Sequence, residues 1–383
     1  MKGAALGLAV LLFFGTLTLW VEERAAWSLF QLGVFLLAGW RLVKMRWRQV
    51  PVPFWPLAAA CCWPFLQVLL RRSMAPARTW NAALDWFTFL VVFALAAEVL
   101  ADQGARRWFL RAAVLFGMLL AAEATVQNYS SGGKIFWLFA SGYGEGVMGP
   151  FVNRDQYSAW IELLLPVALY LAFTDPRRRV LWGSAAAVLF GSLVAGASRA
   201  GFVLAGGELL AAVAVAGLRN LASRRTLVAA AVQIAVLGGI AATVAGWREL
   251  QSRLEIQSPE AVRVDAVRAS TQMVLDHPWF GTGLGTWPTV YPAYAGLDTG
   301  LLVNQAHNDW AQWAAEGGLP FLLLLAVFSL LCCKKAVPSI YGLGVVAFLL
   351  HALVDYPMQQ RPVLAAWFFV MAGAATVWPG GRS

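Results

Sequence analysis

A short polar segment, residues 304–310, directly precedes a long apolar run. It contains His307, Asn308 and Asp309 in succession. A histidine exchanges protons near neutral pH, so His307 is the candidate general base, and Asn308 and Asp309 are candidate substrate-binding residues. We interpret a second polar pair, His351 and Asp355, as mainly structural.

Arginines form a second group of candidates, because a guanidinium binds phosphate oxygens through two parallel hydrogen bonds. Arg199 lies in a tight turn between two long apolar runs. The turn has no further loop residues that could carry its charge away from the ends of the two helices. Asn153 and Arg154 precede another apolar run, where they would lie at a helix N-terminus, a natural anion site. These residues indicate a phosphate-bearing ligand.

Four more arginines are candidate anion ligands. Arg263 and Arg268 would project from a short loop helix, and Arg71 and Arg72 follow an apolar run. The alternatives are contact with lipid headgroups or ion pairs with nearby carboxylates. On the loop helix, such pairs with carboxylates three residues earlier would contribute only a few tenths of a kcal/mol each.

The composition places these residues in a membrane. Of the 383 residues, 60% are hydrophobic and 13% are charged, and the mean hydropathy is +0.65. Soluble domains average about 45–50% apolar and about 25% charged residues. A disordered chain, a basic nucleic-acid-binding domain and a disulfide-stapled module are therefore excluded. The four cysteines form two adjacent pairs without zinc or redox spacing, and we interpret them as packing residues.

A membrane-spanning helix needs roughly 20 mostly apolar residues, and the sequence predicts about twelve within one polytopic domain, residues 1–383. The first is interpreted as an uncleaved helix, because no small-residue cleavage site follows it. The predicted spans are 4–20, 26–43, 53–70, 80–101, 108–127, 156–174, 180–197, 200–217, 226–246, 308–333, 338–354 and 362–379.

Every even-numbered span ends in a basic cluster, which predicts a cytoplasmic N-terminus by the positive-inside rule. The two long loops, 128–155 and 247–307, would then lie outside. Cations remain on that outer side, where they are usually avoided, which favours an anionic ligand there. They are Arg71, Arg72, Arg78, Lys134, Arg154, Arg199, Arg248, Arg253, Arg263, Arg268 and Arg361.

The large outer loop, 247–307, is predicted to contain a short helix. Ser258 would cap it, Pro259 suits its first position, and His277 lies where it stops. Three alternate glycines, at 281, 283 and 285, follow without the strand–turn–helix unit of a dinucleotide site. They predict a tight backbone path.

Five segments in order resemble the motif blocks of the O-antigen ligase and polymerase superfamily. They read GPFVNRDQYSAW, SRAG, AVRVDAVRASTQMVLDHPWFGTGLGTW, QAHNDWAQWAAEGGLP and HALVDYPMQQRP, and they cover residues 149–362. The resemblance implies a GT-C-type membrane glycosyltransferase that acts on undecaprenyl-pyrophosphate-linked glycans. By the same resemblance, Arg199 matches the arginine that holds pyrophosphate, Arg263 matches the loop-helix arginine, and His307 matches the base. Val267 stands where the family often has Trp, and Asp155 where it often has Asn.

Such a reaction needs charge stabilisation on the departing pyrophosphate and removal of a proton from an acceptor hydroxyl. Arg199 and Arg263, helped by Arg154 and Arg268, would serve the first need, and His307 the second. Direct displacement would invert the anomeric centre. No outer Asp-x-Asp pair is present, although Glu22-Glu23 lies in the first outer turn, so we expect neither a metal nor a cofactor.

The expected partners are the lipid-linked donor, a lipid A-core or glycan acceptor and membrane lipids, with no nucleic acid. The expected location is the bacterial inner membrane, with the active site facing the periplasm. An O-antigen ligase is the first hypothesis. A polymerase that extends the lipid-linked glycan and, less favoured, a protein O-glycosylating enzyme share its chemistry. A lipid-linked glycan transporter is the alternative of another class, but the broken helices and inverted repeats of transporters are not evident.

Overall fold

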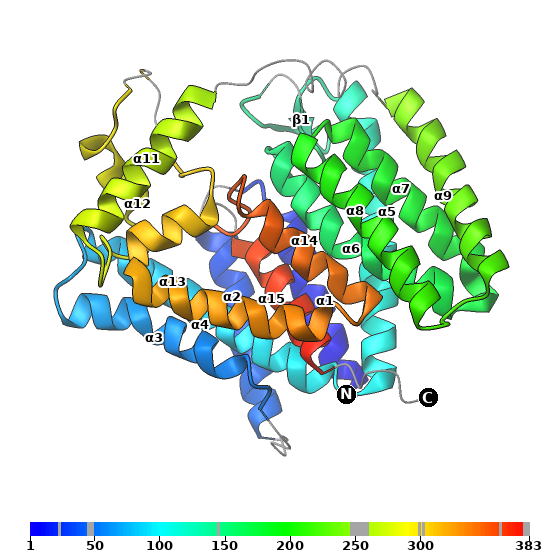
Figure 1. Cartoon of the computed structure of the whole chain (residues 1–383), viewed down its shortest axis with the longest axis horizontal. Helices are drawn as coiled ribbons and strands as arrows, with labels where there is room; N and C mark the ends of the chain where they lie inside the picture. The colour runs from blue at the N-terminus through cyan, green and yellow to red at the C-terminus, as the bar shows by residue number, and fades with distance from the viewer. Residues whose placement is uncertain are drawn as a thin grey trace.

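A computed structural model describes residues 1–21, 24–43, 50–143, 146–245, 260–297, 300, 303–359 and 362–377. It is a bundle of helices (Figure 1), with a helix at each predicted span. These helices are α1 (Lys2–Leu17), α2 (Arg24–Leu42), α3 (Phe54–Leu69), α4 (Pro76–Val99), α5 (Gln103–Ser130), α6 (Arg154–Thr174), α7 (Arg179–Gly196), α8 (Arg199–Leu218), α9 (Arg224–Ala245), α13 (Asp309–Ala336), α14 (Leu343–His351) and α15 (Pro362–Thr376).

Seven helices in the described part of the chain are long and apolar enough to cross a membrane. They are α2, α4, α5, α6, α7 with its preceding turn η1 (Pro176–Arg178), α8 and α13. Four shorter apolar helices are α1, α3, α14 with its preceding turn η3 (Ile340–Gly342), and α15. The chain is thus an all-α membrane protein, while the count of twelve crossings stays a prediction.

Polar caps begin several of these helices. Asp102 accepts a 2.7 Å hydrogen bond from the Ala105 amide at the start of α5, and Asn308 accepts a 2.9 Å bond from Ala311 at the start of α13. Such caps satisfy backbone amides that lack a partner within the helix. Short polar segments between apolar runs therefore fix where these helices start.

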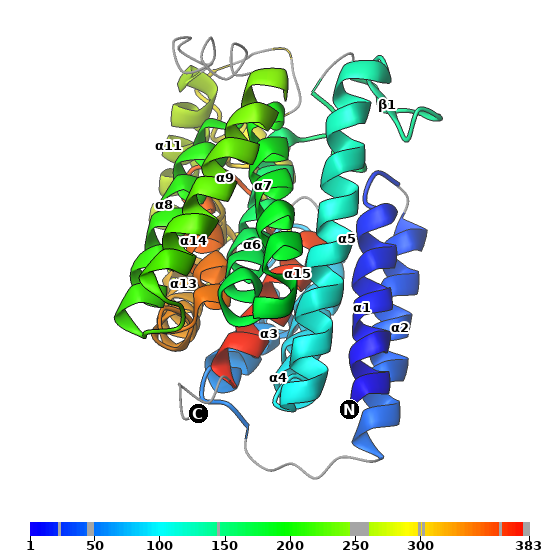
Figure 2. The ribbon, with the colours of Figure 1, turned by 90° about the vertical axis from the view of Figure 1, so that its right-hand side faces the viewer.

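The two ends of the bundle differ. The start of α1 and the end of α15 lie at one end, whereas α11 (Glu260–Asp276) and the small hairpin of β1 (Lys134–Ile135) and β2 (Phe139–Ala140) lie at the other (Figures 1 and 2). The described parts of both long loops thus share one end, which agrees with the orientation derived from the basic clusters. We call this end the outer end.

The outer loop has its own small core. Ala266, Ala269 and Met273 of α11 pack with Trp287 of α12 (Trp287–Val290) and with Tyr291 of the following turn η2 (Tyr291–Ala293). The predicted loop helix is therefore present, and it ends at the residue before His277. The predicted cap, Ser258 and Pro259, lies outside the described residues, as do Arg248, Arg253 and Arg361.

The three alternate glycines hold this loop against the membrane helices. Gly281, Gly283 and Gly285 all have positive φ, at 65°, 110° and 78°. A β-carbon on Gly281 would collide with the backbone at Glu316 of α13. Glu316 also accepts 2.9 Å hydrogen bonds from the amides of Gly285 and Trp287. The predicted tight backbone path is confirmed, and its function is to seat the loop on α13.

Candidate functional site

The N-termini of α6 and α8 lie next to each other at the outer end. Asn153 caps α6 and Ser198 caps α8, so that Arg154 and Arg199 are the first residues of the two helices. The Ser198 hydroxyl also donates a 2.6 Å hydrogen bond to Asp155, on the first turn of α6. Two helix N-termini, each with an arginine, thus meet at one surface, where the arginines and helix dipoles attract an anion and the Asp155 carboxylate opposes it.

The turn before α8 is built for this arrangement. Helix α7 ends at Ala197, which adopts a left-handed conformation with φ 53° and ψ 36°. This conformation normally costs an L-residue roughly 1–2 kcal/mol. It reverses the chain within two residues, so that Ser198 can cap α8 and Arg199 starts the helix. The tight turn predicted from the sequence is confirmed.

His307 lies just before α13, and its side chain is 29% exposed. Its Nδ1 atom is 3.5 Å from the Oδ1 atom of Asp355, which is almost fully buried. A carboxylate beside one imidazole nitrogen holds a proton there and leaves the other nitrogen free to accept one. The His307 backbone has φ 52°, a conformation found mainly in glycine, asparagine, aspartate and histidine.

Tyr356 connects His307 with α6. The rings of Tyr356 and His307 meet edge to face, with centroids 4.7 Å apart. The Asn153 side-chain amide donates a 3.3 Å hydrogen bond to the Tyr356 hydroxyl. Burial, followed by the proximity of Asp355, raises the pKa of Tyr356 above its ordinary value, so the hydroxyl stays protonated at neutral pH. The candidate base and the cap of α6 therefore belong to one network.

Asn308 and Asp309 hold His307 in place. Asn308 caps α13 and donates a 2.8 Å hydrogen bond from its amide to the Leu353 carbonyl. Asp309 is buried, and one of its carboxylate oxygens accepts a 3.0 Å bond from the Met358 amide. Both side chains thus tie the start of α13 to the segment after α14. Their predicted contact with substrate stays a prediction.

A buried histidine extends the network inward. The Nδ1 atom of His351 is 2.7 Å from a Glu162 carboxylate oxygen, and its Nε2 atom has no hydrogen-bond partner among the described residues. Ligand atoms of Asp155, His351 and Asp355 lie within 4.8 Å of one another, a spacing that fits a metal ion. Ser198 bonds the Oδ1 atom of Asp155 and Glu162 contacts the Nδ1 atom of His351, so each of these two residues keeps a second ligand atom.

The other predicted arginines are placed elsewhere. Arg268 pairs with Asp265 on α11 at 3.1 Å, which is the ion-pair alternative considered from the sequence. The Arg72 guanidinium stacks over the Phe280 ring, 5.9 Å from its centroid, and Arg71 lies beside it in the turn after α3. Arg263 is half-buried on α11. No hydrogen bond or ion pair between described residues brings these four to the network around His307.

Asp265 is instead a structural centre of the outer loop. It is buried, and it accepts hydrogen bonds from the Tyr291 hydroxyl at 2.9 Å, the Gly296 amide at 3.1 Å and Arg268. Burial raises its pKa, but the three hydrogen bonds and the Arg268 charge outweigh burial and leave the pKa below its ordinary value. The charged form of Asp265 thus joins α11 to η2.

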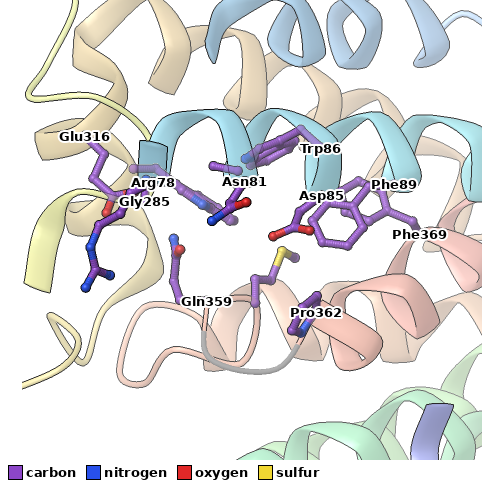
Figure 3. Close-up of a pocket in the computed structure, with 13 residues that line it drawn as sticks. Arg78, Asn81, Asp85, Trp86, Phe89, Gly285, Glu316, Gln359, Pro362 and Phe369 are labelled. Atoms are coloured by element: carbon purple, nitrogen blue, oxygen red, sulfur yellow. The ribbon is translucent and has the colours of Figure 1, made fainter. Parts of the chain in front are cut away.

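A second feature of the outer end is a cavity between α4, α13 and α15 (Figure 3). Its wall includes Met358 and Gln359, which directly follow Asp355 and Tyr356 of the network. The cavity and the His307 network thus share the segment between α14 and α15. Polar and aromatic side chains both line the cavity, a combination typical of small-molecule sites.

The sequence interpretation missed several members of the network. The sequence predicts a mainly structural role for Asp355, and it does not single out Asp155, Tyr356 or Glu162 as site residues. A signal was present for two of them, since Asp155 and Tyr356 lie inside the quoted motif blocks. Glu162 also had a signal, because an ionisable residue inside an apolar run is costly to bury.

Comparison with known proteins adds a family to this geometry. Residues 184–326 match a family described as O-antigen ligase. The match includes Arg199, Arg263, Arg268 and His307, and it confirms the resemblance seen in the sequence blocks. No curated protein matches the chain.

Proposed function

We propose that the chain transfers a glycan from undecaprenyl pyrophosphate to an acceptor outside the cytoplasm, because residues 184–326 match a family described as O-antigen ligase. The preferred acceptor is the lipid A-core of the bacterial outer surface. The observation that carries the proposal is the set of contacts that connects His307 with the cap of α6: Asp355 lies 3.5 Å from His307, the Tyr356 ring meets the His307 ring, and Asn153 donates a hydrogen bond to Tyr356.

The donor pyrophosphate would bind at these paired N-termini. Arg154 and Arg199 would supply guanidinium groups, and the two helices would supply the positive ends of their dipoles, while the caps Asn153 and Ser198 accept hydrogen bonds from first-turn amides. This charge would stabilise the pyrophosphate as it gains negative charge on leaving. Arg263 would contact the pyrophosphate only if α11 moved toward α8 when the donor binds. Arg268 would contact it only by giving up its ion pair with Asp265.

The acceptor hydroxyl would lose its proton to His307. Asp355 would hold the proton of Nδ1, so that Nε2 is the basic nitrogen. The acceptor oxygen then forms a bond to the anomeric carbon while the bond from that carbon to the pyrophosphate oxygen breaks. The displaced electron pair stays on undecaprenyl pyrophosphate, and the proton stays on His307. One displacement of this kind inverts the anomeric centre.

The proposed location is the inner membrane, with the outer end facing the periplasm. The positive-inside alternation supports this orientation, and the placement of α11 and the hairpin at one end (Figures 1 and 2) agrees with both long loops lying on the same side. A reporter enzyme inserted near Asp298 tests it. Activity of the reporter only outside the cytoplasm is expected, whereas cytoplasmic activity would overturn the orientation and the site.

Purified protein, incubated in detergent with a lipid-linked glycan, tests the reaction itself. One arm adds lipid A-core as acceptor, and a second arm adds only more lipid-linked glycan. A product on lipid A-core supports a ligase, and a lengthened lipid-linked glycan supports the polymerase alternative, because the donor residues serve both. Absence of transfer in both arms, with the donor still bound, would favour the transporter alternative.

A further inference from the structure

The cavity between α4, α13 and α15 has a volume of about 190 Å³. Figure 3 shows Asn81 and Asp85, from α4, and Gln359, from the segment before α15, pointing toward the same space. The cavity opens at the outer end, because Asn81 is exposed near the start of α4 and Gln359 is half-exposed. It is separate from the paired helix N-termini that carry Arg154 and Arg199.

The cavity has hydrogen-bonding capacity that the protein leaves unused. The Nε2 atom of Gln359 is buried and has no hydrogen-bond partner among the described residues. Asp85 receives hydrogen bonds from Trp27 at 2.7 Å and Gln31 at 3.2 Å, both on Oδ1, which leaves Oδ2 able to accept from a ligand. A buried donor without a partner costs about 1–3 kcal/mol, so a ligand that pairs with it gains affinity.

Aromatic rings form the other part of the lining. Trp86 and Phe89 of α4 meet Phe369 of α15, with ring centroids 6.2 Å and 5.1 Å from that of Phe369, and Trp313 of α13 lies 6.2 Å from Trp86. These contacts fix the rings and keep the wall of the cavity rigid. A suitable ligand therefore presents hydroxyl groups on some edges and an apolar face on another, as a sugar ring does.

The charges around the cavity are balanced. Asp85 and Glu316 contribute two carboxyl groups, Arg78 lines the cavity, and the Arg24 guanidinium lies 3.5 Å from Asp85. Glu316 is held by two backbone amides and by Gln312, so it is not free to turn away. Neutral hydroxyl groups fit this balance of charges, because they can donate hydrogen bonds to carboxylates and accept them from amides.

We propose that this cavity binds a neutral sugar residue of the transferred or accepting glycan. The inference rests on the proposed function for the identity of its ligand. Gln359 follows Asp355 by four residues, so a sugar held here would lie against the same segment that positions His307. The cavity would thus hold one glycan beside the base while the pyrophosphate occupies the neighbouring helix N-termini.

The test measures binding without turnover. Delipidated core oligosaccharide is added to the purified full-length protein, and its contact with the protein is followed by saturation-transfer NMR. Asn81→Ala and Gln359→Ala each remove one amide, and we expect each to weaken binding by roughly 3–10-fold. Gln272→Ala is the matched control, because Gln272 is an exposed amide on α11 that donates a hydrogen bond to Asp276 and lies outside the cavity lining.

Kinetics then assigns the bound sugar. A rise in KM for the lipid A-core acceptor assigns the cavity to the acceptor, and weaker binding of the lipid-linked donor assigns it to the donor glycan. Either result supports the proposal. Unchanged oligosaccharide binding, KM and donor affinity in both variants would overturn it, as would loss of inorganic pyrophosphate binding instead. The protein could also bind oligosaccharide through Asn81 and Gln359 and yet transfer no glycan. This result would support the sugar-binding cavity and reject the proposed reaction.

Discussion

The hydroxyl of Ser198 donates a 2.6 Å hydrogen bond to the carboxylate of Asp155, and this contact joins the N-termini of α8 and α6. The two residues are 43 positions apart in the sequence. The contact fixes the spacing between the helix starts that carry Arg154 and Arg199. The paired anion site therefore depends on a short side-chain bond as well as on the arginines.

Ser198→Ala removes this bond together with the cap of α8. We expect donor affinity to fall by roughly 3–10-fold, the usual effect of one lost hydrogen bond. Stability should fall by about 1 kcal/mol through the lost cap. Ser223→Ala is the control, since Ser223 is hydrogen-bonded to the Thr226 amide at the opposite end of the bundle. Equal donor affinity in the two variants would show that the Ser198–Asp155 bond does not shape the anion site.

Asp355→Asn tests whether this carboxylate positions His307. An amide keeps the shape of the side chain but cannot stabilise a protonated imidazole, so turnover should fall by roughly 10–10³-fold with donor affinity unchanged. Asp175→Asn breaks the 2.7 Å ion pair with Arg111 at the other end of the bundle and serves as control. If both variants turn over at the wild-type rate, Asp355 is only structural, as the sequence interpretation held.

The positions of the helices were predictable because the signal is local. Twenty apolar residues in succession must form a helix in a bilayer, since backbone groups there find no water. All the predicted spans therefore contain helices, and the loop helix α11 was found from its own pattern. The hairpin of β1 and β2 was not predicted, because strands of two residues leave no periodic signal.

The site was only partly predictable because its contacts join distant segments. His307 and Arg199 were identified from residue type and position, but their connection runs through Asp355, Tyr356, Asn153 and Asp155. Asp355 meets His307 only because α13 and α14 bring residues 48 positions apart together. Arg268 was a candidate ligand, yet its nearest carboxylate, three residues earlier on the helix, is its partner in the structure.

Asp265 makes the docking of the outer loop sensitive to acid. Its pKa is lowered in the folded protein, so its contribution to stability is present above its ordinary pKa of about 3.9 and is lost as the pH falls through the lower folded value. The protection factors of residues 260–297, which compare their exchange rates with those of an unfolded peptide at the same pH, should therefore fall below about pH 4. Asp265→Asn should show low protection already at pH 7, unlike Asp276→Asn. A wild-type loop whose protection does not change in acid would contradict this role.

Removal of divalent metal ions tests whether arginines alone neutralise the negative charge of the pyrophosphate. We expect transfer to continue at the same rate in excess chelator, because Arg154 and Arg199 would neutralise the pyrophosphate. Activity that is lost in chelator and restored by magnesium or manganese would contradict this. Asp155, His351 and Asp355 would then be the first ligands to substitute, because their spacing fits a metal ion.

The central claim divides the chemistry between Arg199 and His307, and donor affinity measured beside single-turnover rate in detergent tests it most directly. His307→Asn suits this test, because asparagine tolerates the left-handed backbone at this position. It should bind donor normally and react roughly 10²–10⁴-fold more slowly. Arg199→Ala should bind donor roughly 10–100-fold more weakly and also react more slowly. Arg199→Lys should restore part of the loss, because lysine keeps the positive charge but cannot form two parallel hydrogen bonds to phosphate. A folded His307→Asn protein that turns over at the wild-type rate, or an Arg199→Ala protein that binds donor normally, would contradict the account.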